Sequence, residues 1–190
     1  MHRTRHTTHE GPVTVERLDG PGAARLEEAF SLVYAEAFAE PPYGEGPDDV
    51  AAAFRRFRTQ ARDPAFRAAL ARTAGGEPVG MAYGRPLPPD TDWWDHLTTP
   101  VPPDVRREDG HRTFGLLELA VRAPWRGRGV ARALHETLLD GVGTERVLVD
   151  VHRDAEEATA AYRAWGYRKV SEARSQDSGD VYVVMVRELG

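Results

Sequence analysis

Two glycines flanked by arginines form the part of this chain best suited to chemistry, the run Arg126-Gly127-Arg128-Gly129-Val130-Ala131. It lies between a strand-like apolar run, residues 116–121, and a helix-like run, residues 130–139. Backbone N–H groups at a helix start have no acceptor within the helix, and the helix dipole is positive there. Arginine adds affinity for phosphate. The sequence therefore predicts a site for a phosphate-bearing cofactor.

Two common nucleotide-binding motifs fit this loop less well. The phosphate loop of nucleoside triphosphatases requires a lysine followed by serine or threonine, which this loop does not contain. The dinucleotide fingerprint needs a glycine or alanine where Arg132 stands, although Asp150 lies at the distance of its acidic partner. This dinucleotide alternative stays open, as does a simple glycine turn that begins a helix.

Hydrophobic periodicity predicts the elements that position this loop. The expected strands are residues 13–18, 66–73, 78–83, 114–121, 147–151, 167–170 and 181–187. The expected helices are residues 23–38, a second helix that carries Val50, Phe54 and Phe57 behind a cap at Asp48 or Asp49, and residues 130–139 and 155–165. This order predicts a mixed sheet with helices on its faces and a parallel, right-handed unit over residues 116–151.

Composition limits the class of protein. The chain has 190 residues, with 41% hydrophobic and 29% charged, which is typical of one soluble domain with its own core. A net charge of −5 argues against nucleic-acid binding, and no apolar run is long enough for a membrane span. The chain has no cysteine, which fits a cytoplasmic location and excludes a cysteine nucleophile. We expect a disordered tail over residues 1–11 and a single domain over residues 12–190.

The loop and the helix predicted after the fifth strand together resemble a known family. The pattern of Arg or Gln, two residues, Gly, one residue, then Gly or Ala is matched by Arg126, Gly129 and Ala131. This resembles the acyl-CoA signature of the GNAT N-acetyltransferases. A second similarity lies in the helix and turn near residue 160, in the residues Ala158, Tyr162, Gly166 and Tyr167. The resemblance is specific over residues 116–170.

The resemblance implies a fold and a cofactor. The fold is α/β (α+β), a mostly antiparallel sheet of about seven strands flanked by about four helices, with the fourth and fifth strands parallel and splayed. The cofactor is acetyl-CoA, whose pyrophosphate would bind the backbone N–H groups of the loop and whose pantetheine arm would pair with the preceding strand. The implied contacts are Leu119, Ala120, Val121, Arg126, Gly127, Arg128, Gly129, Val130 and Ala131.

Two residues are candidates for proton transfer. The resemblance implies that Tyr162 protonates the departing thiolate, and a phenol with a pKa near 10 suits that role. Glu118 is the only charged residue in its strand, so desolvation there would raise its pKa and make it a usable base. The alternatives are a core tyrosine and a glutamate that faces solvent or orders a bulge.

The acceptor side is less defined. The residues Tyr43, Trp93 and Trp94 are candidate substrate contacts, the tryptophans from a long proline-rich segment, residues 85–111. Nearby acids that would suit a cationic amine are Glu40, Glu45, Asp92 and Asp95. Alternatively, one tryptophan fills the core and the acids are solvated. His111 and His152 could assist proton transfer. Ala155 stands where many members of the family have an asparagine that contacts the pantetheine, and Asp154 beside it could cap the helix.

The expected activity is acetyl-CoA-dependent transfer of an acetyl group to a primary amine of a small molecule or peptide. The amine would attack directly in a ternary complex, without a metal or a covalent acyl-enzyme. The resemblance allows a homodimer. Two alternatives remain: a non-catalytic module that senses acyl-CoA, and a nicotinamide-dependent oxidoreductase.

Overall fold

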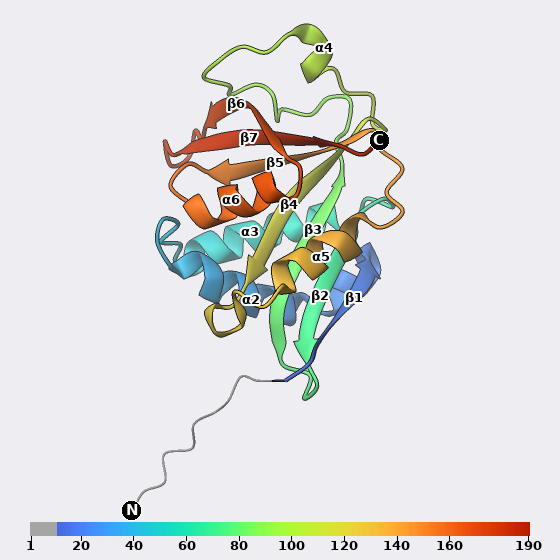
Figure 1. Cartoon of the computed structure of the whole chain (residues 1–190), viewed down its shortest axis with the longest axis vertical. Coiled ribbons are helices and arrows are strands. Elements are labelled where there is room, and N and C mark those ends of the chain that lie inside the picture. Colours follow the sequence, from blue (N-terminus) through green and yellow to red (C-terminus); the bar gives the residue numbers. More distant parts are fainter. Residues whose placement is uncertain (1–10) are drawn as a thin grey trace, which may run out of the picture.

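One seven-stranded sheet organises the chain (Figure 1). The computed structural model describes residues 11–190, so the predicted tail, apart from Gly11, lies outside the described residues. The strand order is β1-β2-β3-β4-β5-β7-β6, and every neighbouring pair except β4 and β5 is antiparallel. The strands are β1 Val13–Asp19, β2 Arg67–Thr73, β3 Pro78–Pro86, β4 Thr113–Val121, β5 Arg146–His152, β6 Arg168–Arg174 and β7 Val181–Glu188. The predicted mixed, mostly antiparallel sheet is confirmed.

Six helices accompany the sheet within residues 11–190, rather than the expected four. They are α1 Gly20–Arg25, α2 Glu27–Ala39, α3 Pro47–Gln60, α4 Pro103–Arg106, α5 Val130–Leu139 and α6 Glu156–Ala164. The additional helices are the short α1 and α4. No helix of the described part has the length and apolar character needed to cross a bilayer.

The helix expected over residues 23–38 is divided at Leu26. The first part begins early because the Asp19 side chain accepts a hydrogen bond from the Gly22 N–H at 2.8 Å. Leu26 then leaves helical geometry, with φ −108° and ψ 22°, and a new helix begins at the next residue. The start of α3 also differs from the prediction. Gly46 is its N-cap, and Asp49 accepts from the Gly46 N–H at 2.9 Å.

The sheet has a core on each face. Alternate residues of β2 point to opposite faces: Ala69 and Ala71 contact the cluster of α5 and α6, whereas Ala68 and Leu70 contact the cluster of α1, α2 and α3. Figure 1 shows α5 and α6 on one face of the sheet and α2 and α3 on the other. On α5 the residues predicted to face inward, Val130, Leu134 and Leu138, are all buried. The helix that follows the glycine loop is therefore fixed firmly against the sheet.

The parallel pair β4 and β5 is short. Residues Thr113 to Leu116 pair with Arg146 to Val149, and beyond these residues the two strands have no pairing. A bulge lies at the same point of β4, because Tyr83 and Gly84 of β3 pair with Glu118 and Leu116 and leave Leu117 as an extra residue. A bulge bends its strand and increases its twist. The strands therefore diverge after Leu116, as the resemblance implied.

The long segment between β3 and β4 covers the end of the sheet at β5, β6 and β7 (Figure 1). Its Leu97 forms a bridge with Ala173 of β6, and its Trp94 is buried with the Arg146 guanidinium 5.4 Å from the ring centroid. Arg146 forms a buried ion pair with Glu108 at 3.1 Å. These contacts make the segment a fixed cover rather than an open loop.

Candidate functional site

Two cavities lie where β4 and β5 diverge, with volumes of about 750 Å³ and 610 Å³. The first is lined by the loop of residues 126–131 and is called the glycine-loop cavity. The second is lined by six carboxylates and is called the acidic cavity. Five residues line both cavities, so the two cavities adjoin along these side chains. The shared residues are Phe38, Tyr43, Leu119, Ala158 and Tyr162.

The loop backbone fits an anion. Gly127 and Gly129 have φ values of +74° and +80°, a region that L side chains rarely adopt. A Cβ on either residue would meet nothing within 4 Å, so the space in front of the loop is open. The Ala133 N–H donates to the Gly129 carbonyl at 3.0 Å, and the three preceding amides begin the helix without an acceptor inside it. This cradle suits a pyrophosphate.

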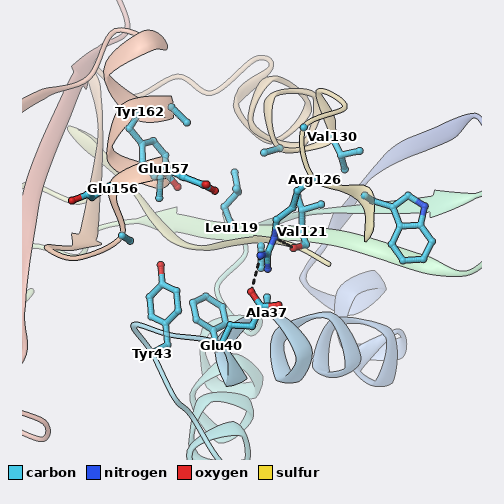
Figure 2. Close-up of a pocket in the computed structure, with 18 of the residues that line it drawn as sticks. Ala37, Glu40, Tyr43, Leu119, Val121, Arg126, Val130, Glu156, Glu157 and Tyr162 are labelled. Carbon is cyan, nitrogen blue, oxygen red and sulfur yellow. Dashed lines mark hydrogen bonds and ion pairs between the residues drawn. The ribbon is translucent and has the colours of Figure 1, made fainter. Parts of the chain in front are cut away.

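The Arg126 side chain is held on the cavity wall. It donates to the Val121 carbonyl at 2.9 Å and to Glu40 at 2.7 Å (Figure 2). Much of its charge is therefore compensated by Glu40. Arg128 is exposed. The anion site consequently depends on backbone amides more than on the two guanidinium groups. From the sequence, we expected the arginines to have a larger part in phosphate affinity.

The end of β4 lines the glycine-loop cavity through Leu119, Ala120 and Val121. These residues pair with β3 on one side and lack the β5 partner on the other. The backbone groups on that open edge can pair with an extended ligand as an added strand would. The structure thus brings all the predicted cofactor contacts except Arg128 to the lining of one cavity.

Tyr162 lies at the junction of the cavities. It comes from α6, and Figure 2 shows it and Tyr43 approaching the cavity from opposite sides. Its ring packs against Trp165 and Tyr167, with centroid separations of 5.4 Å and 5.2 Å. Burial raises the pKa of the Tyr162 phenol well above its usual range, so the phenol keeps its proton. Tyr162 therefore packs in the core and also lines both cavities.

Glu118 reaches the acidic cavity from β4 and is partly exposed there. Burial and, to a smaller extent, the nearby Glu45 raise the pKa of its carboxyl to about 8, and Arg56 opposes the shift. The hydrogen bonds of Glu45 are with the Tyr34 hydroxyl, at 2.8 Å and 3.0 Å. Glu118 can therefore accept a proton at slightly alkaline pH, as a general base requires.

The candidate substrate contacts lie in different places. Tyr43 lines both cavities, but neither Trp93 nor Trp94 lines either of them. Trp94 is buried beneath its own segment, among the apolar residues that cover Leu148 and Val184. Trp93 donates its Nε1–H to Asp150 at 2.9 Å. It reaches the site only through Asp150, which lines the acidic cavity.

Most of the carboxylates that line the acidic cavity were not predicted from the sequence. The carboxylates are Glu45, Asp49, Glu118, Asp150, Asp177 and Asp180. Of the acids expected on the acceptor side, only Glu45 lines this cavity, whereas Glu40 is paired with Arg126 and Asp95 with Arg106 at 3.3 Å.

A sequence signal for this lining exists in the alternation of Asp150 and His152 along a strand, which places both on one face. Both side chains line the acidic cavity. Burial raises the pKa of Asp150 to about 7, and its bond from Trp93 opposes the shift.

Two further expectations need correction. Asp154 does not cap α6, whose N-cap is Ala155 without a side-chain hydrogen bond. Both residues nevertheless line the glycine-loop cavity. His111 is exposed and lines neither cavity, whereas His152 is buried and lines the acidic one.

Comparisons with known proteins agree with this geometry. The sequence model of the family described as Acetyltransferase (GNAT) family matches residues 27–167. No curated protein matches the sequence. Among solved structures, the ribosomal-protein-S18-alanine N-acetyltransferase from Escherichia coli has 17% identity and a TM-score of 0.60, covering 94% of this chain and 95% of that one.

Two other structures are similar. The paia N-acetyltransferase from Thermoplasma acidophilum, in complex with coenzyme A, has 12% identity and a TM-score of 0.60, covering 93% of this chain and 99% of that one. The histone acetyltransferase HPA2 and related acetyltransferase from Corynebacterium glutamicum ATCC 13032 has 23% identity and a TM-score of 0.62, with 92% and 95% covered. At these identities the similarity shows the fold.

The raised pKa of Glu118 predicts a pH-dependent gain in stability from Glu118→Gln. The unfolded carboxyl loses its proton near 4.5 and the folded one near 8, so wild-type stability is lost as pH rises between these values. The glutamine cannot ionise. We expect the thermal midpoint of Glu118→Gln to exceed that of the wild type by an amount that grows from about pH 5 to about pH 8.

The matched control is Glu28→Gln, an exposed position on α2. Its midpoint should stay close to that of the wild type, because substitutions at exposed positions outside both cavities change stability little. If the difference in thermal midpoint between Glu118→Gln and the wild type stays constant across this pH range, Glu118 is not desolvated.

Proposed function

The chain belongs to the GNAT acetyltransferase family, and from this premise we propose that it transfers an acetyl group from acetyl-CoA to a primary amine of a small molecule or peptide. One observation carries the proposal: the glycine-loop cavity and the acidic cavity adjoin between the diverging strands, and both are lined by Leu119 and Tyr162. An acyl donor held in one cavity and an amine held in the other can therefore form a ternary complex.

The donor half rests on backbone groups. The amides at the start of α5 would hold the pyrophosphate, and the open edge of β4 at Leu119 and Val121 would pair with the pantetheine arm. When bound, acetyl-CoA supplies a thioester carbonyl at the junction of the cavities. The positive φ at Gly127 and Gly129 keeps that part of the wall free of side chains.

The reaction needs two proton transfers, and one residue is available for each. The amine nitrogen forms a bond with the thioester carbon while the carbon–sulfur bond breaks. Glu118, directly or through a water molecule, would take the proton that the amine loses. Tyr162 would give its proton to the departing sulfur. Burial makes its phenol a weaker acid than the pKa near 10 expected from the sequence, but a thiolate that forms in the same buried place is disfavoured as an anion for the same reason. No covalent acyl-enzyme is required, and the chain has no cysteine to form one.

Aromatic side chains shield the junction. Phe38 and Tyr43 pack edge to face with centroids 4.7 Å apart, and both line the two cavities. Their position limits the water that reaches a bound thioester, which favours transfer to an amine over hydrolysis. A cytoplasmic location and a single domain over residues 12–190 belong to the same proposal.

The alternative functions make different demands. In a dinucleotide-binding protein the acidic partner reaches the ribose beside the glycine loop. Here Asp150 lines the acidic cavity and not the glycine-loop cavity, which disfavours a nicotinamide enzyme. A non-catalytic sensor of acyl-CoA needs the loop but neither a base nor a second cavity. Glu118 lines the acidic cavity and is partly exposed, so a base is available there, which favours an acetyltransferase over a non-catalytic sensor.

The proton-donor role of Tyr162 predicts a selective loss in Tyr162→Phe. Phenylalanine keeps the ring packing but has no proton to give, so we expect kcat to fall by about 10²–10⁴-fold. The dissociation constant of CoA should stay within about threefold, because the phenol is needed in the transition state rather than for binding. Steady-state kinetics and calorimetry measure the two effects.

Tyr167→Phe is the matched control. Tyr167 belongs to the same aromatic cluster and bonds His135 at 2.7 Å, but it lines neither cavity. Its kcat should stay near the wild-type value. If Tyr162→Phe turns over as fast as the wild type, Tyr162 is not the acid.

The cradle predicts that Gly129→Val weakens CoA binding. A side chain at this position would enter the space of the pyrophosphate, and we expect the dissociation constant of CoA to rise at least about tenfold. Gly76→Val is the control, because Gly76 has a similar φ of +86° in the turn between β2 and β3, away from the cavities.

Both variants carry the same backbone strain, so a common loss of thermal stability is expected. Only Gly129→Val should lose CoA affinity in a calorimetric titration. Equal CoA affinity in the two variants would place the pyrophosphate elsewhere.

A further inference from the structure

The carboxylates of the acidic cavity include two separate pairs. Glu118 and Asp150 come from the diverging strands β4 and β5, and Glu118 directly precedes Leu119, which lines both cavities. Asp177 and Asp180 come from the turn between β6 and β7. These are called the inner pair and the outer pair. Each pair offers its own position for a positive charge.

Strand register sets the distance between the pairs. Asp150 lies opposite Val184 of β7, and His152 lies opposite Tyr182. Asp180 is two residues before Tyr182, so Asp150 and Asp180 are four positions apart along one face of the β5–β7 ladder. At about 3.3 Å per residue, the two residues are about 13 Å apart along the ladder. Ammonium groups bound on the inner side of each carboxylate would therefore be separated by on the order of 10 Å.

The wall between the pairs is aromatic. The rings of Tyr43 and His152 have centroids 5.8 Å apart, and those of His152 and Tyr182 have centroids 5.3 Å apart. All three residues line the acidic cavity. An aliphatic chain can pack on these rings, and their faces also attract ammonium groups.

His152 provides an independent sign that the cavity is built for a ligand. Its side chain is only 6% exposed, and its Nδ1 accepts a hydrogen bond from the Asp154 N–H at 3.1 Å. Because Nδ1 accepts, Nε2 is the ring atom that is available as a donor. Within residues 11–190 the Nε2–H has no hydrogen-bond partner, since Asp180 is 3.6 Å away. A buried donor left unsatisfied in a cavity is costly. An ammonium group only donates, so a water molecule carried by the ligand would accept from Nε2–H and complete it.

The remaining charges favour the outer pair as the second anchor. Glu45 and Asp49, on the facing wall, already accept hydrogen bonds from Tyr34 and from the Gly46 N–H. Asp180 keeps 45% of its side chain exposed, and Asp177 is exposed. Arg56 is the single arginine or lysine of the cavity lining, against six carboxylates.

We infer that the acceptor is a small molecule with at least two basic nitrogens about 10 Å apart, whose reacting primary amine lies at the inner pair and whose second ammonium binds Asp177 and Asp180. This inference rests on the proposed function and names the substrate class of the same site. Charge-assisted hydrogen bonds to two carboxylates would hold the second nitrogen, and the aromatic wall would hold the chain between the nitrogens.

The test compares diamines with monoamines of equal length. Acetylation of 1,6-diaminohexane and 1,8-diaminooctane by the wild type is measured against n-hexylamine and n-octylamine. We expect kcat/KM for each diamine to exceed that of its monoamine at least about tenfold, mainly through KM. In the double variant Asp177→Asn/Asp180→Asn this ratio should fall to about one, whereas Asp90→Asn, an exposed residue outside both cavities, should keep it.

A second readout separates this inference from the proposed function. Calorimetry follows the binding of 1,6-diaminohexane to the CoA-bound wild type and double variant. If amines are acetylated without preference for diamines, the inference fails and the proposed function stands. If no amine is acetylated but the diamine binds the wild type and not the double variant, the outer pair is a cation site and the proposed function fails. If the diamine neither binds nor reacts, both fail.

Discussion

Four residues of β4 pair with β5, and then the two parallel strands part. Every feature of the site depends on this divergence. It exposes one edge of β4 to an extended ligand, it opens the passage in which Tyr162 stands, and it brings Glu118 and Asp150 to the rim of one cavity. The bulge at Leu117 supports the divergence, and Gly84 permits the close approach of β3 to β4 beside the bulge, because a Cβ there would collide with the Gly115 carbonyl.

Local rules explain what the sequence could predict. Helix α5 has the predicted bounds because its apolar period and the glycines before it are local signals. The sheet and its parallel pair follow from element order and connection rules. Leu26 and α4 could not be predicted in this way. The division falls at Leu26, a residue type that does not mark a helix end, and α4 lies in a segment without periodicity.

The residues of the site were also predictable only where a local sequence pattern marks them. The loop, Tyr162 and Glu118 carry recognisable patterns, and the structure brings them to the junction of two cavities. Trp93 and Trp94 carry no pattern that distinguishes a substrate wall from a core, and tertiary packing placed them beneath the long segment. The outer pair of carboxylates could not be predicted because strand register, rather than chain distance, places Asp180 beside His152.

The central claim is that a donor and an acceptor meet in a single continuous passage. It is tested most directly by a bisubstrate ligand in which the sulfur of CoA is joined through an acetyl group to one nitrogen of 1,6-diaminohexane. Because both halves would bind at once, calorimetry should show an affinity at least about 100-fold greater than that of CoA alone. An affinity equal to that of CoA would contradict the claim, since the acceptor half would then have no place beside the donor.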